Sequence, residues 1–153
     1  QKVWRAERAQ KGRAREFYQC DADVVGESDV AIDGELIALA ASTIRSLEIG
    51  PFVIKINNRK LLTGVYEALG LQEKSVEILR LIDKIEKIGA DAVVEQLIAL
   101  GLDTAAAQEL LEMTHLNGPV ETVLTTLREK NIQNATFIRG IEELERVVQV
   151  ARA

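Results

Sequence analysis

The stretch that decides the fold reads VWRAERAQKGRAREFYQCDADVV and occupies residues 3–25. Two strands are predicted within it, over residues 3–8 and 17–25, because the character of the side chains alternates along both segments. The basic loop 9–14 joins them, and its Gly12 permits a backbone conformation that other residues resist. We therefore expect a hairpin at the start of the chain.

The predicted hairpin has two contrasting faces. On the second strand, the apolar face should lie against the core, with its cysteine as core filler; it carries Tyr18, Cys20, Ala22 and Val24. The opposite face of that strand carries Phe17, Gln19, Asp21 and Asp23. On the first strand, Arg5 and Glu7 share one face, and Trp4 lies on the other, where we expect it in the core.

The polar face suits a nucleotide together with a small ligand that carries an amino group. Arginine gives forked, permanently charged recognition of phosphate oxygens, and the ring of Phe17 can stack on a base. The amide of Gln19 or the carboxylate of Asp23 can hold an ammonium group. A second interpretation is equally open from the pattern alone: a twisted hairpin whose charges keep an exposed sheet edge soluble.

The composition is that of an ordinary globular protein in which the charge is unevenly placed. The 153 residues are 47% apolar and 28% charged, and the net charge of −5 argues against a generally basic nucleic-acid-binding module. Residues 1–17 nevertheless hold six basic and two acidic side chains, so they carry +4 and the remaining chain carries −9. An anion site in an acidic protein is the simplest interpretation. No apolar run is long enough to span a bilayer.

The rest of the chain is predicted to be helical, with one further strand. Asp33 should cap a helix over residues 34–47 that packs on the sheet, and residues 52–56 form a pattern typical of a buried strand. Asn58 should cap a helix over 59–69. Beyond it we expect helices only, with apolar stripes that include Val76, Leu79, Ile82 and Ile85, and finally Phe137, Ile141, Leu144, Val147 and Val148. His115, the sole histidine, lies next to a predicted turn and favours a capping or surface role.

Two blocks of this sequence resemble a known family. Trp4–Glu7, the loop and Arg15–Asp23 resemble motif 2 of class II aminoacyl-tRNA synthetases in the form used by histidine–tRNA ligases, and Phe52–Leu62 is similar to the strand and helix start that follow. The chain departs from the family pattern at three alanines, where proline, tyrosine and phenylalanine are expected: Ala9, Ala14 and Ala22.

The resemblance implies an α+β fold that combines part of the class II antiparallel sheet, with its packed helices, and an all-helical insertion domain. It divides the chain into a partial catalytic core over 1–57, the insertion over 58–134 and a helix returning to the core over 135–153. In the family the insertion contacts the acceptor arm of tRNA(His). Residues 71–131 hold six basic and eleven acidic side chains, so we assign no tRNA-contacting residue within them.

The resemblance also implies a reaction and a role for each site residue. Histidine is activated by ATP with Mg²⁺, and the histidyl group then passes to tRNA(His), in a cytoplasmic homodimer. By this likeness Arg5 contacts the α-phosphate as the catalytic arginine, Glu7 the adenine amino group and Arg13 the terminal phosphates. Phe17 stacks on adenine, while Gln19 and Asp23 hold the α-amino group of histidine. No residue of the chain is assigned as a metal ligand.

Several family features do not occur in these 153 residues. There is no motif 1, no later histidine-specific segment, no motif 3 arginine and no anticodon-binding domain. We therefore expect an internal fragment of the ligase that is inactive alone. Two alternatives stay open: the non-catalytic synthetase paralogue that regulates histidine biosynthesis, and a helical interaction module with an incidental basic hairpin.

Overall fold

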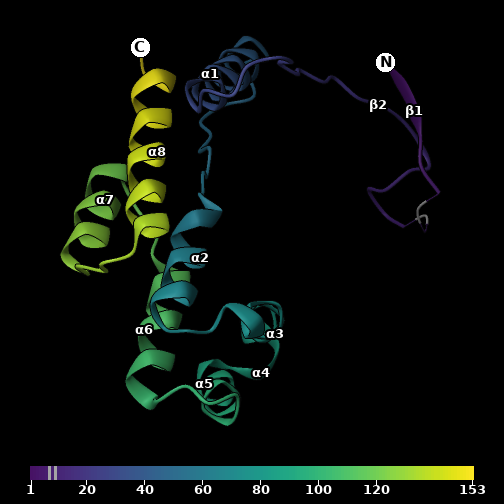
Figure 1. Cartoon of the computed structure of the whole chain (residues 1–153). Helices are drawn as coiled ribbons and strands as arrows, with labels where there is room; N and C mark the ends of the chain where they lie inside the picture. The colour runs from purple at the N-terminus through teal and green to yellow at the C-terminus, as the bar shows by residue number, and fades with distance from the viewer. Residues whose placement is uncertain (7, 9) are drawn as a thin grey trace.

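The chain divides into a small hairpin and a helical body, which the ribbon of Figure 1 shows standing apart. The computed structural model describes residues 1–6, 8 and 10–153. The hairpin consists of β1 (Lys2–Trp4) and β2 (Glu16–Tyr18). The body contains eight α-helices and one short 3₁₀ helix in the described part of the chain, so the fold is α+β. An irregular segment leads from the hairpin to the first helix at the top of Figure 1.

The helices follow one another with short connections. Their bounds are α1 (Ala31–Ser46), α2 (Arg59–Ala68), η1 (Gln72–Lys74), α3 (Ser75–Ile82), α4 (Ile85–Ile88), α5 (Ala90–Ala99), α6 (Thr104–His115), α7 (Val120–Glu129) and α8 (Ala135–Ala151). In Figure 1 the long helix α8 runs beside α2 and meets α1 near the C-terminus, while α3, α4 and α5 gather at the opposite end of the body. No helix among the described residues is both long and apolar enough to cross a membrane.

The hairpin is antiparallel, and its strands are shorter than the sequence predicts. Val3 pairs with Phe17, and the backbone bonds continue outward from Arg5 N to Arg15 O at 2.9 Å. The loop closes in a tight turn at its tip, where Arg13 N donates to Gln10 O at 2.8 Å and Gly12 has a φ of +80°. This left-handed conformation favours glycine, which explains the residue at the tip of the loop.

The apolar face predicted for the hairpin is not buried, which corrects the sequence analysis. Tyr18 is 80% exposed, Trp4 is 66% exposed, and Cys20 and Val24 are exposed as well. The reason is the position of α1: the helix expected to cover this face packs on α8 instead. Cys20 is therefore not core filler in this structure, and the hairpin is not supported from behind by the helical body.

The inner helices of the body pack closely because glycine lies where they cross. A Cβ atom added at Gly34 of α1 would lie 2.6 Å from Val147 O of α8, and one at Gly64 of α2 would lie 2.4 Å from Phe137 N. A Cβ at Gly140 of α8 would meet Leu61 N at 3.0 Å. These contacts leave no room for a side chain, so α8 serves as the central support for both α1 and α2.

Of the two helix starts that the sequence assigned to a capping residue, one is confirmed. Asn58 accepts from Lys60 N at 2.9 Å, as expected of an N-cap, and Asp103 caps α6 in the same way by accepting from Ala106 N at 2.7 Å. The exception is α1, which begins before Asp33 and places that residue inside its first turn. The side chain that bonds the start of this helix is Asp29, whose Oδ1 accepts from Ala31 N at 2.8 Å.

Burial confirms one predicted stripe and corrects another. All five predicted residues of the last helix are buried, and Phe137 is only 1% exposed. In α3, however, the fully buried residue is Ile78, whereas Val76 and Leu79 are 57% and 42% exposed. Both assignments satisfy helical spacing, so the sequence pattern alone could not determine which face of α3 meets the core.

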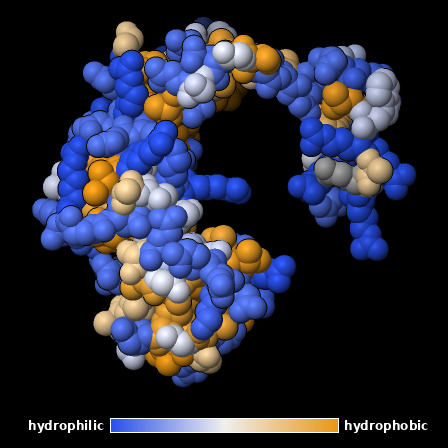
Figure 2. Space-filling view, in the orientation of Figure 1, coloured by the Kyte–Doolittle hydropathy of each residue, from blue (hydrophilic) through white to orange (hydrophobic). Residues whose placement is uncertain are grey.

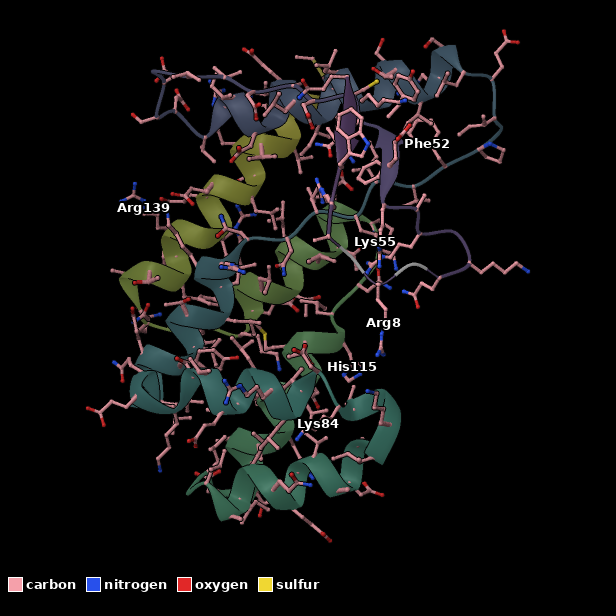
Figure 3. All side chains as sticks on the ribbon, turned by 90° about the vertical axis from the view of Figure 1, so that its right-hand side faces the viewer. Arg8, Phe52, Lys55, Lys84, His115 and Arg139 are labelled. Carbon is pink, nitrogen blue, oxygen red and sulfur yellow. The ribbon has the colours of Figure 1, made fainter. Side chains whose placement is uncertain are left out.

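The predicted strand over 52–56 is extended but, within the part of the chain that the structure describes, it joins no sheet. Its side chains alternate between partly buried and exposed, and Val53 is 84% exposed. Figure 1 places this segment on the body side, between α1 and α2, away from the hairpin. Figure 3 labels Phe52 and Lys55 on it. The buried strand is therefore not formed, because no neighbouring strand provides backbone partners.

A charged cluster fastens the start of α2 to α8. Asn58 Nδ2 donates to Glu143 Oε2 at 3.0 Å, Arg139 Nε donates to Glu143 Oε1 at 3.0 Å, and Lys60 forms an ion pair with the same carboxylate. These partners hold the pKa of Glu143 down at about 2, with the Lys60 bond as the largest cause. The Arg139 label in Figure 3 marks this cluster on α8.

Candidate functional site

The register of the hairpin brings three of the predicted site residues to one face. Because Val3 lies opposite Phe17, the odd-numbered side chains of both strands point to the same side. The Arg5 guanidinium lies over the Phe17 ring, 5.4 Å from its centroid, and Arg5 Nη2 donates to Gln19 Oε1 at 2.7 Å. The alternation in the sequence predicted that Phe17 and Gln19 share a face, and the register of the strands adds Arg5 to it.

The loop adds a second cation to that face. An open hollow of about 640 Å³ is lined by Arg5, Gln10, Gly12, Arg13, Ala14 and Phe17. It therefore contains two arginines and one aromatic ring, which can bind an anion and an attached flat group. The space-filling view in Figure 2 shows the hairpin separated from the helical body by a wide gap.

The amide of Gln19 connects Arg5 to a carboxylate. Gln19 Nε2 donates to Asp21 Oδ1, so Asp21 is linked to Arg5 through one side chain. Asp23, which the sequence analysis assigned to the substrate amine, takes no part in this set of bonds and is exposed. Glu7, the residue assigned to adenine, lies outside the described residues.

Two residues of the face were missed as site candidates. Gln10 lines the hollow because its carbonyl closes the loop turn with Arg13. Asp21 contacts Gln19, and its place on the polar side of the alternating pattern was the available signal. The turn at Gln10 had no such signal, because it depends on an isolated backbone bridge between Gln10 and Arg13 inside the loop.

The opposite face of the hairpin is a polar network that includes Trp4. Trp4 Nε1 donates to Glu16 Oε2 at 2.9 Å, and Lys2 forms an ion pair with Glu16 while its Nζ lies 5.8 Å from the Trp4 ring centroid. The Lys2 bond, and then the Trp4 bond, hold the pKa of Glu16 below its usual range. These contacts orient Trp4 on the face away from Arg5.

The remaining candidate residues lie far from this site in the sequence. His115 ends α6, and its Nδ1 lies 2.9 Å from Leu111 O, which agrees with the predicted capping role. No group of three or more His, Cys, Asp or Glu side chains suited to a metal occurs among the described residues.

Comparison with known proteins identifies the family. A family model described as histidyl-tRNA synthetase matches residues 1–153. The chain belongs to the histidyl-tRNA synthetase family. A histidine–tRNA ligase from Clostridium tetani is 40% identical over 99% of this chain, and one from Bacteroides fragilis is 43% identical over 95% of it. The crystal structure of histidyl-tRNA synthetase from Nostoc sp. PCC 7120 matches 99% of the chain with a TM-score of 0.83 and 32% identity.

The chain spans about a third of the length of these synthetases. It covers 35% of the Clostridium tetani relative, 32% of the Bacteroides fragilis relative and 35% of the Nostoc chain. The fold likeness extends over the hairpin and the helical body together. These relatives carry the name of the ligase, which favours a histidine–tRNA ligase segment over the regulatory paralogue and over an unrelated helical module.

Proposed function

We propose that the polar face of the hairpin binds the reacting groups of histidine and ATP in a histidine–tRNA ligase. The observation that carries this proposal is the hollow lined by Arg5, Arg13 and Phe17, with Gln19 bonded to Arg5 at its edge. The reaction joins the carboxylate of histidine to the α-phosphate of ATP and releases pyrophosphate. The histidyl group then passes from this adenylate to tRNA(His), and AMP leaves.

The cationic residues would neutralise the charge that the nucleotide brings. Arg5 would contact the α-phosphate, where negative charge is redistributed during the attack, and Arg13 would contact the terminal phosphates that leave. Phe17 would stack on adenine and Glu7 would bind its amino group. The cation–ring contact between Arg5 and Phe17 supports these roles, because it places a charge and a flat surface beside each other on the same face.

The amino acid would be held at the Gln19 end of the same face. Gln19 and Asp23 would accept hydrogen bonds from the α-ammonium of histidine, which leaves its carboxylate on the side of Arg5. No covalent bond to the protein is needed, so these residues act by positioning two substrates and by stabilising charge. Mg²⁺ would accompany the phosphates and supply further charge neutralisation.

The helical body has a separate proposed part. By family resemblance, residues 58–134 form the insertion that meets the acceptor arm of tRNA(His), and residues 135–153 return to the catalytic core. Because α8 packs closely on both α1 and α2, we infer that this last helix connects the insertion to the catalytic core. The homodimer and the cytoplasmic location are likewise proposals that follow from the family.

Calorimetric titration of the 153-residue chain with ATP tests the nucleotide site. Arg5→Ala should weaken ATP binding at least about tenfold, since a charge-assisted contact to phosphate is lost. Arg146→Ala is the matched control, because Arg146 is an exposed arginine on α8 that bonds Gln149 at 3.3 Å. Equal ATP affinities for wild type, Arg5→Ala and Arg146→Ala would overturn the proposed site.

A further inference from the structure

Asp21 lies at the end of a directed chain of hydrogen bonds. Arg5 Nη2 donates to Gln19 Oε1, and Gln19 Nε2 donates to the Asp21 carboxylate. Gln19 is partly buried, whereas Arg5 and Asp21 are exposed. The family resemblance assigned roles to Arg5 and Gln19 but none to Asp21, so the carboxylate requires an explanation of its own.

The chemistry of the three groups allows only one orientation of the amide. A guanidinium has donors and no acceptor, and an ionised carboxylate has acceptors and no donor. The Gln19 amide must therefore turn its oxygen to Arg5 and its nitrogen to Asp21. If the amide turned by half a revolution, its NH₂ group would face the guanidinium and its oxygen would face the carboxylate, and both contacts would be repulsive.

This orientation presents an acceptor where a substrate ammonium is proposed to bind. In the free protein the Gln19 oxygen is satisfied by Arg5. A substrate with an anionic group and an ammonium group side by side would replace that contact with two others. The anionic group would bind Arg5, and the ammonium group would donate to the Gln19 oxygen. Once Arg5 turns to the anionic group of the substrate, Asp21 is the partner that still fixes the amide. Without Asp21 the amide could then rotate and offer donors to an ammonium, which also has only donors.

We propose that Asp21 is a positioning residue that locks the Gln19 amide with its oxygen toward the α-ammonium of the amino acid. This inference rests on the proposed function, because it specifies how the amine of the substrate is recognised at that site. Asp21 itself acts through Gln19. Its removal should therefore affect ligands that carry the α-amino group and spare otherwise identical ligands that lack it.

The test compares two non-hydrolysable histidyl-adenylate analogues, one with and one without the α-amino group. Calorimetry on Asp21→Ala should show about tenfold weaker binding of the amino-bearing analogue and unchanged binding of the deamino analogue. Asp21→Asn should weaken the amino-bearing analogue less, since its carboxamide retains one acceptor oxygen. Glu27→Gln is the control, an exposed carboxylate that bonds only the nearby amides Ser28 N and Asp29 N.

A second readout needs no ligand. The side-chain NH₂ signals of Gln19 in a ¹⁵N correlation spectrum should move in Asp21→Ala toward those of an exposed glutamine such as Gln149, while the backbone signals of the helical body stay in place. If Asp21→Ala weakens the binding of both analogues equally, or weakens neither and leaves the Gln19 signals unmoved, the proposed role of Asp21 is overturned while the proposed function stands. Failure of the wild-type chain to bind either analogue would overturn the proposed function and this inference with it.

Discussion

Glu143 shows how much one side chain contributes to the junction between α2 and α8. Its carboxylate accepts from Asn58 and Arg139 and pairs with Lys60, so three groups from two helices meet at one residue. The side chain is only 15% exposed, and removal of its charge would leave Lys60 without its partner. The sequence did not mark this residue, because its partners are 83 and 85 positions away for Lys60 and Asn58.

The pH dependence of stability follows from this cluster. The folded pKa of Glu143, about 2, lies below its ordinary value of 4.5, so the stabilisation is present above about pH 4.5 and is lost as the pH falls toward 2. Glu143→Gln should lower the free energy of unfolding at neutral pH by about 1–2 kcal/mol, less than the full shift implies, because water screens the partly exposed Lys60. Denaturant titrations between pH 2 and 7 measure the free energy of unfolding of both proteins. A difference between wild type and variant that stays the same over this pH range would contradict the role of Glu143.

At the scale of the element, the packing of α2 on α8 depends on Gly64. A Cβ there would lie 2.4–2.6 Å from backbone and side-chain atoms of Phe137, which cannot move without shifting α8. Gly64→Ala should therefore destabilise the chain by about 1–3 kcal/mol in thermal or chemical unfolding. Gly140→Ala, where the nearest atoms lie at 3.0–3.2 Å, should cost less. If both variants are as stable as wild type, the close helix crossing is wrong.

The elements also mark how far the sequence could predict the fold. The cap at Asn58 depends on local chemistry and was predicted. The environment of Trp4 depends on which distant element arrives, and that prediction was wrong. The predicted stripe that begins in α3 was half right, because Ile82 and Ile85 pack against the core whereas Val76 and Leu79 are exposed. At the candidate site, strand alternation placed Phe17 and Gln19 on one face of the second strand, whereas the approach of Arg5 to them and the bond to Asp21 needed the register and the side-chain geometry.

On the scale of the whole molecule, the hairpin and the helical body are separate parts of the chain (Figure 1), and the proposed site lies on the hairpin. The chain spans about a third of the length of the synthetases that it matches, so the groups of the hairpin are proposed to form one part of a larger site. We expect the chain alone to form no histidyl-tRNA when assayed by transfer of labelled histidine to tRNA(His), with the Clostridium tetani ligase as positive control. Detectable transfer by the purified chain would contradict this expectation and show that these 153 residues suffice for catalysis.

The most direct test of the central claim is to locate where an amino-bearing histidyl-adenylate analogue binds. We predict that titration of the ¹⁵N-labelled chain moves the backbone signals of residues 5, 13, 17 and 19 in a saturable way, and that Arg5→Ala abolishes these shifts. The helices α2 to α8 should be unaffected. Saturable shifts confined to the helical body, or none at the hairpin, would contradict the assignment of the site.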